Sequence, residues 1–328
     1  MTELSEHQSV RERARKKLER DMGPVLLSAL RDPATVELML NADGRLWQEL
    51  LGGEMHCIGH LRSSQAQAII ETIAGYHGKQ VNRAHPLLEG ELPLDGSRFA
   101  GQLPPIVPAP TFAIRKKAVS VFTLDDYVEQ GIMTPQQRDT LDDAVVQHRN
   151  ILVVGGTGSG KTTLVNAIIH QMVEHAPLER VFIIEDTGEI QCAAINHVQY
   201  HTTLDVNMTA LLKTTLRMRP DRILVGEVRG PEALDLLMAW NTGHEGGAAT
   251  LHANHARAGL DRLAMLISMH PEAPQPIEPL IGEAVHVVVH IARTPQGRRV
   301  QDILHVHGWR DGQYRLREPA GAPTPWPL

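Results

Sequence analysis

The sequence feature that most constrains this chain is a glycine-rich turn between an apolar segment and a helical segment. Residues 151–154 are Ile-Leu-Val-Val, residues 155–163 are Gly-Gly-Thr-Gly-Ser-Gly-Lys-Thr-Thr, and apolar residues at helical spacing follow. The pattern G-x-x-x-x-G-K-T between a strand and a helix predicts a phosphate-binding loop, because glycine accepts positive φ and has no Cβ to obstruct a phosphate. A glycine-rich turn with a solvated lysine is the simpler interpretation, but it leaves the flanking strand and helix unexplained.

The same loop predicts how a nucleoside triphosphate is held. Backbone amides turn inward around the phosphates, and the N-terminus of the following helix adds partial positive charge at the same place. Lys161 would reach the β- and γ-phosphates, and the Thr162 hydroxyl would bind Mg²⁺. The expected ligands are therefore a nucleoside triphosphate and Mg²⁺. The chain has no Asn-Lys pair, which the guanine-reading motif Asn-Lys-x-Asp of a GTPase requires, so the triphosphate is expected to be ATP. The predicted nucleotide-binding residues are Gly156, Thr157, Gly158, Ser159, Gly160, Lys161, Thr162 and Thr163.

Two acidic residues follow further buried strands. Residues 181–184 are Val-Phe-Ile-Ile and lead into Glu185, while residues 223–226 are Ile-Leu-Val-Gly and lead into Glu227. In an open α/β sheet, ligands bind at the carboxyl ends of the strands, so both side chains are expected to face the nucleotide. An acidic residue at the end of an apolar strand, downstream of a phosphate loop, is the Walker B pattern. It predicts that Glu227 supports Mg²⁺ through water, together with Thr162 as a direct ligand.

A histidine-containing segment follows, with the sequence His-Glu-Gly-Gly-Ala-Ala-Thr-Leu-His-Ala-Asn-His over residues 244–255. The helical spacing H-E-x-x-H of a zinc site is absent, and two adjacent glycines argue against a helix there. We expect a loop that senses the γ-phosphate rather than a structural metal site.

The first half of the chain has the composition of a small α+β domain. Residues 36–40 and 45–49 read as two strands around an Asp-Gly turn, and residues 63–76 read as a helix. We predict an N-terminal domain over residues 1–122, a linker with a short helix over 123–136, an ATPase domain over 137–318 and a disordered tail over 319–328.

The segment from Arg11 to Arg20 contains six basic and two acidic residues, beside apolar positions at helical spacing. One interpretation is a peripheral contact with anionic lipid or an acidic partner. The other, which we favour, is a solvated basic face on an amphipathic helix that packs on its own domain.

Composition limits the remaining possibilities. A length of 328 residues suits two domains, and the two distant cysteines, Cys57 and Cys192, suit a reducing compartment. The N-terminus is polar and lacks a secretory signal, and no apolar run approaches the ~20 residues of a membrane span, so a cytoplasmic location is expected. A net charge of −6 and 4% aromatic residues argue against direct binding of nucleic acid.

Four motifs in this order resemble the secretion-ATPase superfamily, which comprises the hexameric traffic ATPases of type II secretion, type IV secretion and type IV pili. The motifs are the phosphate loop 155–162, the acidic box 184–189, the Walker B strand 223–229 and the histidine box 244–254. Residues 96–99 and 112–116 are similar to the N-terminal domain of that family. A compact N-terminal domain without a cysteine cluster points to the type IV secretion branch, and residues 41–47 resemble TrbB-type conjugative transfer ATPases.

The resemblance implies a RecA-like C-terminal domain, a smaller PAS-like N-terminal domain and a ring of six subunits with nucleotide bound between the two domains. It implies that the chain works with inner-membrane components of a secretion or conjugation apparatus, on the cytoplasmic face of that membrane. A RecA-like motor that acts directly on DNA, such as a helicase or recombinase, is the alternative.

The resemblance also implies roles for individual residues. Glu185 would polarise the attacking water and Glu227 would support Mg²⁺ or assist the water, which leaves open which glutamate is the base. Arg98 and Arg115 would reach the phosphates from the N-terminal domain, in cis or in trans. His252, and with less support His244, would sense the γ-phosphate. Weaker candidates for the subunit interface are Arg217, Arg219 and Arg229.

Overall fold

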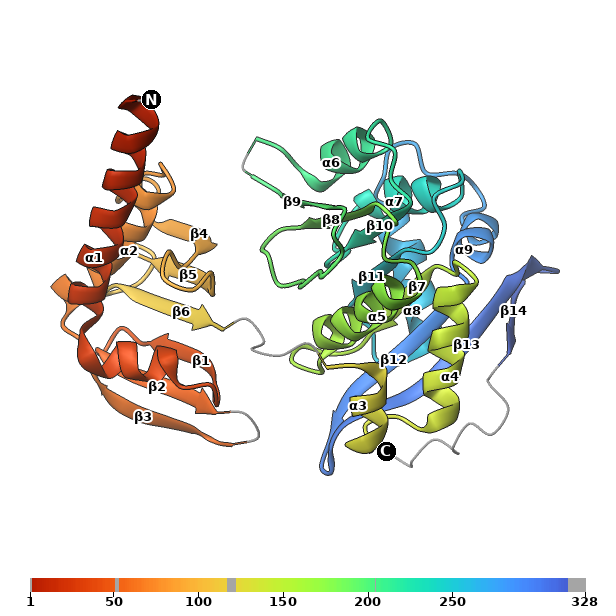
Figure 1. Ribbon diagram of the computed structural model, residues 1–328, viewed down its shortest axis with the longest axis horizontal. Coiled ribbons are helices and arrows are strands. Elements are labelled where there is room, and N and C mark those ends of the chain that lie inside the picture. The colour runs from red at the N-terminus through yellow and green to blue at the C-terminus, as the bar shows by residue number, and fades with distance from the viewer. Residues whose placement is uncertain (1, 51–52, 117–121, 204, 318–328) are drawn as a thin grey trace. The chain divides into compact units, whose positions relative to one another are not determined.

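The computed structural model describes residues 2–50, 53–116, 122–203 and 205–317 (Figure 1). The predicted tail 319–328 lies outside these residues. The chain divides into two compact units, Met1–Val119 and Ser120–Leu328.

The first unit combines two helices with an antiparallel sheet of strand order β3-β2-β1-β6-β5-β4. The predicted hairpin forms β1 and β2, and Gly44 takes a φ of +83° at its turn, where a Cβ would lie 2.8 Å from the Leu61 carbonyl oxygen. The helices and strands are α1 (Thr2–Arg31), β1 (Thr35–Leu40), β2 (Arg45–Leu50), β3 (Met55–His60), α2 (Ser63–Tyr76), β4 (Leu87–Glu91), β5 (Arg98–Gln102) and β6 (Thr111–Arg115).

Helix α1 packs on this unit through its apolar side. Leu18, Met22 and Leu26 are fully buried in the core with α2, and Lys17 donates a hydrogen bond of 2.5 Å to the Thr72 hydroxyl. The basic residues from Arg11 to Arg20 are exposed. Because the unit's own core occupies the apolar side of the helix, any contact of this segment with a membrane would depend on charge alone.

The second unit is an α/β domain around an eight-stranded sheet of order β14-β13-β12-β7-β11-β10-β8-β9. Neighbouring strands from β12 to β9 pair in parallel, and β13 and β14 add an antiparallel edge. The elements are α3 (Leu124–Glu129), α4 (Pro135–Val146), β7 (Ile151–Val154), α5 (Lys161–His175), β8 (Val181–Glu185), β9 (His197–His201), α6 (Met208–Thr215), β10 (Arg222–Val225), α7 (Glu232–Trp240), β11 (Ala248–Leu251), α8 (Ala256–Ile267), α9 (Glu278–Ala284), β12 (Val287–Thr294), β13 (Gly297–Arg310) and β14 (Gln313–Arg317).

Helices cover both faces of this sheet, as Figure 1 shows. One core packs α6, α7, α8 and α9 on the sheet, and the other packs α3, α4 and α5 on the opposite face. All four residues of β7, β10 and β11 are buried. Central parallel strands are mostly apolar on both faces because helices cover each side, which explains the apolar runs in the sequence, with Arg222 of β10 and Thr250 of β11 as buried polar exceptions.

Residues 123–136, predicted as a linker with a short helix, belong to the second unit and contain that helix as α3. Thr123 and Thr134 begin α3 and α4 with capping boxes, and Leu124, Tyr127 and Met133 are buried in the core beneath α5. These apolar side chains give the segment a fixed place in the second unit. Its Gly and Pro residues punctuate short helices rather than a free connection.

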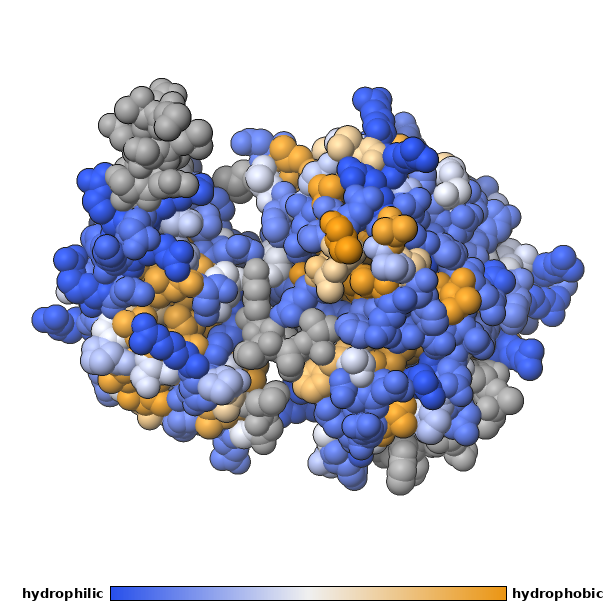
Figure 2. Space-filling model, viewed as in Figure 1, coloured by the Kyte–Doolittle hydropathy of each residue, from blue (hydrophilic) through white to orange (hydrophobic). Residues whose placement is uncertain are grey.

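Within the described residues, no helix has the length and apolar content that crossing a bilayer requires. The surface in Figure 2 is predominantly hydrophilic on each unit, and apolar side chains gather in small separate patches.

Candidate functional site

The predicted motifs meet at one edge of the second sheet. The phosphate loop follows β7, His252 follows β11, Glu227 comes two residues after β10, and Glu185 is the last residue of β8. These strands are neighbours in the order β7-β11-β10-β8 and run parallel, so their carboxyl ends lie side by side. Ligands of open α/β sheets bind at this edge.

The phosphate loop has the backbone geometry that its glycines predict. Gly158 and Gly160 have φ of +69° and +97°, and α5 begins immediately afterwards at Lys161. A Cβ on Gly155 would overlap the carbonyl oxygen of Ile291 on β12. A loop of this shape, in front of a 15-residue helix, presents amides and the positive end of the helix to an anion.

Lys161 lies against its own loop. Its side chain is 8% exposed, and Nζ donates to the carbonyl oxygens of Gly155 at 3.1 Å and Gly156 at 3.0 Å. The Nδ1 atom of His252 lies 3.4 Å from the same ammonium group. A buried ammonium held by carbonyl oxygens at this loop is placed to exchange them for phosphate oxygens.

Glu227 lies between positive groups. Its Oε2 accepts a 2.6 Å hydrogen bond from Arg229, and Oε1 lies 2.7 Å from Nε2 of His252. Burial, the largest influence, raises the pKa of Glu227. The hydrogen bond from Arg229 and the charges of Arg229, His252 and Lys161 outweigh burial, so the pKa lies below its ordinary value and the carboxylate stays ionised.

His252 is held neutral at this position. Burial is the largest influence and lowers the pKa of its imidazole, and the ammonium of Lys161 lowers it further. The carboxylate of Glu227 acts in the opposite direction and is outweighed. A neutral imidazole between Lys161 and Glu227 can donate one hydrogen bond and accept another, as a sensor of a nearby phosphate requires.

Glu185 occupies a different position from the one we predicted for a water-activating base. The carboxylate is 2% exposed, and its Oε1 accepts from the amides of Glu189 at 3.1 Å and Ile190 at 2.9 Å. Its Oε2 accepts from Nε2 of Gln199 at 2.7 Å. A carboxylate occupied on both oxygens holds the loop after β8 rather than polarising a water. Burial raises its pKa although these three hydrogen bonds lower it.

Close packing also explains why residue 226 is a glycine. Gly226 directly follows β10 and lies next to Glu185, the last residue of the neighbouring strand β8. A Cβ on Gly226 would lie 2.8 Å from Cγ of Glu185. The absence of a Cβ on Gly226 therefore makes room for the side chain of Glu185.

Glu189 is the acidic residue that sequence reasoning did not select. Its Oε2 accepts a hydrogen bond of 3.4 Å from the hydroxyl of Thr162, the residue predicted to bind Mg²⁺. The sequence feature that could have identified Glu189 is its place in the acidic box 184–189. Only the turn that Glu185 organises brings it back to the phosphate loop, and a strand pattern ending at Glu185 does not reveal that turn.

These oxygen atoms suit a magnesium ion. The Thr162 hydroxyl and the carboxylates of Glu189 and Glu227 are hard oxygen donors at the edge where the phosphates would bind. In the part of the chain that the structure describes, no group of three or more His, Cys, Asp and Glu side chains is arranged to hold a metal. A site with few protein ligands fits Mg²⁺, which keeps waters and takes phosphate oxygens as partners.

Substitution distinguishes the role of Glu189 from that of Glu185. We expect Glu189→Gln to lower ATP turnover by about 10²-fold, because it removes charge beside Thr162, and to leave the unfolding temperature unchanged. Glu185→Gln should lower the unfolding temperature, because a glutamine that keeps its oxygen on the two amides of the turn places its own NH2 group against the NH2 group of Gln199, donor against donor. Thermal unfolding and steady-state turnover measure both. Full turnover in Glu189→Gln, with lost turnover and unchanged unfolding in Glu185→Gln, would restore Glu185 as the base.

His244 is not beside the phosphate loop, contrary to our expectation of a γ-phosphate-sensing loop there. The 244–247 segment precedes β11, whereas His252 follows it, and Ala248 pairs with Ile151 at the start of β7. The four residues of β11 span roughly 13 Å at the usual rise of a strand. His244 therefore lies at the amino edge of the sheet, and only His252 reaches the loop.

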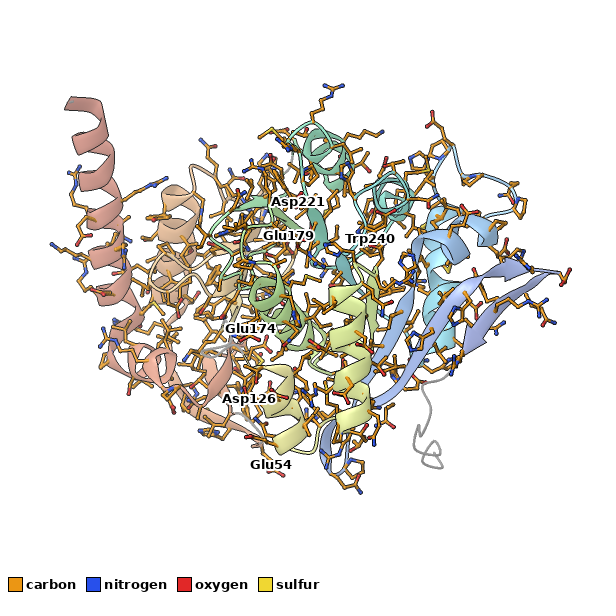
Figure 3. All side chains as sticks on the ribbon, turned by 45° about the vertical axis from the view of Figure 1, so that its right-hand side comes forward. Glu54, Asp126, Glu174, Glu179, Asp221 and Trp240 are labelled. Atoms are coloured by element: carbon orange, nitrogen blue, oxygen red, sulfur yellow. The ribbon has the colours of Figure 1, made fainter. Side chains whose placement is uncertain are left out.

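The amino edge carries a polar network of its own, centred on the buried side chain of Arg222. Arg222, 1% exposed, pairs through Nε with the carboxylate of Glu179, which Figure 3 labels, and Nη1 donates to the carbonyl of Gly246 at 3.0 Å. His148 contacts both members of this pair, because its Nε2 lies 2.6 Å from Oε1 of Glu179 and 3.2 Å from Nη2 of Arg222. Asn150 Oδ1 accepts from the amide of Gly246 at 2.8 Å. This network fixes the turn that leads into β11.

The predicted arginines occupy three places. Arg98 and Arg115 are cross-strand partners on β5 and β6 of the first unit, so the sheet brings them together. Arg229 bridges Glu227 and Asp186, with a 3.2 Å hydrogen bond to the latter. Arg217 and Arg219 are exposed in the segment after α6.

Comparison with known proteins identifies relatives over most of the chain. The family described as "Type II/IV secretion system protein" matches residues 91–321. The chain is 48% identical to the "Probable conjugal transfer protein TrbB" of Sinorhizobium fredii, over 92% of each chain. It is 46% identical to the conjugal transfer protein TrbB of Rhizobium radiobacter, over 96% of each chain. Identity to the type IV secretion system protein PtlH of Bordetella pertussis is 34%, over 84% of this chain and 90% of the relative.

Solved structures share the fold. The Legionella pneumophila ATPase DotB aligns with a TM-score of 0.61 at 20% identity, over 85% of this chain and 79% of that one. The pilus retraction motor PilT with bound ADP aligns with a TM-score of 0.61 at 19% identity, over 90% and 83%. The fold, the motifs and the relatives agree with the resemblance seen in the sequence, and the chain belongs to the Type II/IV secretion system protein family.

Proposed function

We propose that this protein is an Mg²⁺-dependent ATPase that powers a type IV secretion or conjugative transfer system. The observation that carries the proposal is the convergence of the phosphate loop, Glu227, Glu189 and His252 at the carboxyl edge of one sheet. The extent of the similarity to two conjugal transfer proteins, 92–96% of each chain, supports the transfer role.

Phosphoryl transfer requires positioning and charge neutralisation more than covalent chemistry. Lys161 offsets negative charge on the transferred phosphoryl group, and Glu227 and Glu189 supply the charged oxygens that orient the attacking water. His252, neutral and beside both Lys161 and Glu227, registers whether the γ-phosphate is present. When bound, Mg²⁺ neutralises phosphate charge, with Thr162 as the protein hydroxyl that holds it.

We further propose that Arg98 and Arg115 complete the site from the N-terminal unit, so that ATP clamps two units and its hydrolysis releases them. Their direct pairing on β5 and β6 supports a shared role. Glu37 lies opposite Arg115, and burial raises the pKa of Glu37 while Arg115 and Arg98 lower it.

Either substitution, Arg98→Ala or Arg115→Ala, should lower turnover by about 10-fold or more, because each removes a charge-assisted hydrogen bond to phosphate. The unfolding temperature should stay near that of the wild type, as measured by thermal denaturation. Wild-type turnover in both variants would contradict the clamp.

The proposed assembly is a ring of six at the cytoplasmic face of the inner membrane, in contact with membrane components of the apparatus. Exposed basic residues from Arg11 to Arg20 supply charge for a peripheral contact with anionic lipid.

Native mass spectrometry of the full chain, with and without ATP and Mg²⁺, tests the ring, and phosphate release tests the ATPase. A hexamer with turnover in the absence of nucleic acid is the expected result. Hydrolysis that requires single-stranded DNA would favour a nucleic-acid motor instead, and a folded protein that neither binds nor cleaves ATP would overturn the proposal.

A further inference from the structure

The hairpin of β12 and β13 extends past the sheet edge at the phosphate loop. β12 pairs in parallel with β7 up to His290 and Val154, and then continues to Thr294 before the chain turns back at Gly297. The tip of this hairpin carries three arginines, Arg293, Arg298 and Arg299. It therefore brings positive charge from a distant part of the sequence to the nucleotide edge.

The hairpin contacts the phosphate loop near the beginning of the loop, at Gly155, and near its end, at Gly160. The carbonyl of Ile291 lies where a Cβ on Gly155 would be. At the other end, the side chain of Arg298 passes over Gly160, so that a Cβ there would lie 3.0 Å from its Cδ. Nε of Arg298 lies 3.4 Å from the carbonyl oxygen of Gly158 and donates a long hydrogen bond to it. The guanidinium group is thus fixed beside the turn whose amides would bind phosphate.

The arginines at the tip are arranged at an electrostatic cost. Arg293 and Arg298 are directly opposite each other on the two strands and share a face, and both are exposed. Like charges directly opposite on neighbouring strands are destabilising. Among the described residues, no carboxylate lies within ion-pair distance of Arg298. An anion bound at this face would relieve the repulsion.

Arg299 provides the contrast within the same tip. It pairs across the hairpin with Ala292, on the opposite face of the strand from Arg298, and its Nη1 lies 3.9 Å from the position of a Cβ on Gly131. Arg299 carries the same charge as Arg298 and follows it in the sequence, but among the described residues it forms no hydrogen bond with the phosphate loop. It is therefore a matched control for Arg298.

We propose that Arg298 is a nucleotide-binding residue that contacts the polyphosphate of ATP and ADP, with Arg293 adding charge beside it. This inference rests on the proposed ATPase function and adds a contact that no motif of the loop contains. Lys161 lies against Gly155 and Gly156, whereas Arg298 lies against Gly158 and Gly160. The two cations therefore hold different stretches of the same loop, and a polyphosphate in the loop would have positive charge along both.

Isothermal titration of the full-length protein with ADP and with ATP and Mg²⁺ tests the proposal. Arg298→Gln should weaken binding of both nucleotides by about 10-fold or more, because it removes a charged donor to phosphate. Arg298→Lys keeps the charge and should retain most of the affinity, Arg293→Gln should lose less than Arg298→Gln, and Arg299→Gln should bind as the wild type does. The slope of affinity against salt should be smaller for Arg298→Gln than for Arg299→Gln.

The outcomes separate this inference from the function on which it rests. Wild-type affinity in Arg298→Gln would overturn the inference and leave the ATPase intact, as would an equal loss in Arg299→Gln. A loss in Arg298→Lys as large as that in Arg298→Gln would show that the contact of Nε with Gly158, which lysine cannot make, is what matters rather than the charge, and would also overturn it. A wild-type protein that binds neither nucleotide overturns both. Thermal unfolding without nucleotide shows that each variant is folded. The unfolding temperature should be unchanged in Arg298→Lys and Arg299→Gln, and equal to or slightly above that of the wild type in Arg298→Gln and Arg293→Gln, which relieve the repulsion between the two facing arginines.

Discussion

Replacing Lys161 with alanine will abolish ATP turnover, with a loss of about 10³-fold or more, because no other ammonium group reaches the phosphate loop in the described residues. The charge acts where negative charge spreads over the phosphoryl oxygens, in a partly buried site where electrostatic interactions are stronger than in water. Phosphate release at saturating ATP measures the loss. Binding of ADP should weaken as well, because the β-phosphate that Lys161 is predicted to contact is present in ADP and in ATP.

The same variant gives a readout that does not depend on activity. Lys161 lowers the pKa of His252, so its removal should raise that pKa toward the ordinary value of histidine, although burial continues to hold it down. Histidine NMR titration without nucleotide measures the shift. Lys213→Ala is the matched control, because this lysine is exposed on α6 and forms only a 3.6 Å surface ion pair with Asp235. Turnover in Lys161→Ala above a tenth of the wild-type value would exclude the assigned role.

Replacing Arg222 with methionine will destabilise the second unit by about 2 kcal/mol or more, because it removes the buried partner of Glu179, whose side chain is 20% exposed and keeps its contact with His148. The guanidinium group satisfies Glu179 and the carbonyls of Gly246 and Val145 at once, and none of these is replaced by a thioether. Arg222→Lys should recover only part of the loss, because a single ammonium cannot reproduce three directed contacts from a planar group. Urea or thermal unfolding measures the change.

The control for this variant is Arg315→Met. Arg315 pairs with Asp311 at 2.6 Å on the surface, with side chains 53% and 85% exposed, so its loss should cost less than about 1 kcal/mol. Equal effects from the two substitutions would contradict the importance of the network around Arg222. The network anchors the turn before β11. Arg222→Met should therefore increase the hydrogen-exchange rates of the 244–247 amides over their wild-type values, and by a larger factor than it increases those of the β7 amides.

Sequence was most informative where a function is contiguous in the chain. The phosphate loop, its preceding strand and its following helix lie within residues 151–175, so the pattern of glycines and apolar residues contained the whole feature. The buried parallel strands were predictable for a related reason, since apolar runs of four or five residues are typical of strands covered on both faces.

Sequence was least informative where a role depends on which way the chain turns after a motif. Glu185 and Glu189 are four residues apart, and only the hydrogen bonds from the turn to Glu185 show that this carboxylate is committed within the fold. His244 and His252 belong to one sequence motif, yet β11 carries them to opposite edges of the sheet. Residues 123–136 resemble a linker with a short helix because Gly131 and Pro135 interrupt the pattern, and the burial of the segment's apolar side chains in the core could be seen only in three dimensions.

By itself, the sequence determined that this protein has a phosphate loop in an α/β domain, with acidic residues at the ends of neighbouring strands and relatives in secretion. The tertiary structure alone decided which carboxylate faces Thr162, which histidine meets Lys161, and that Arg298, 138 residues after Gly160, lies against the loop. The physical reason is that local patterns specify strands, helices and turns through short-range sterics and hydrophobic burial. Side-chain neighbours from distant segments depend instead on strand order and register, which are set by the packing of the whole domain.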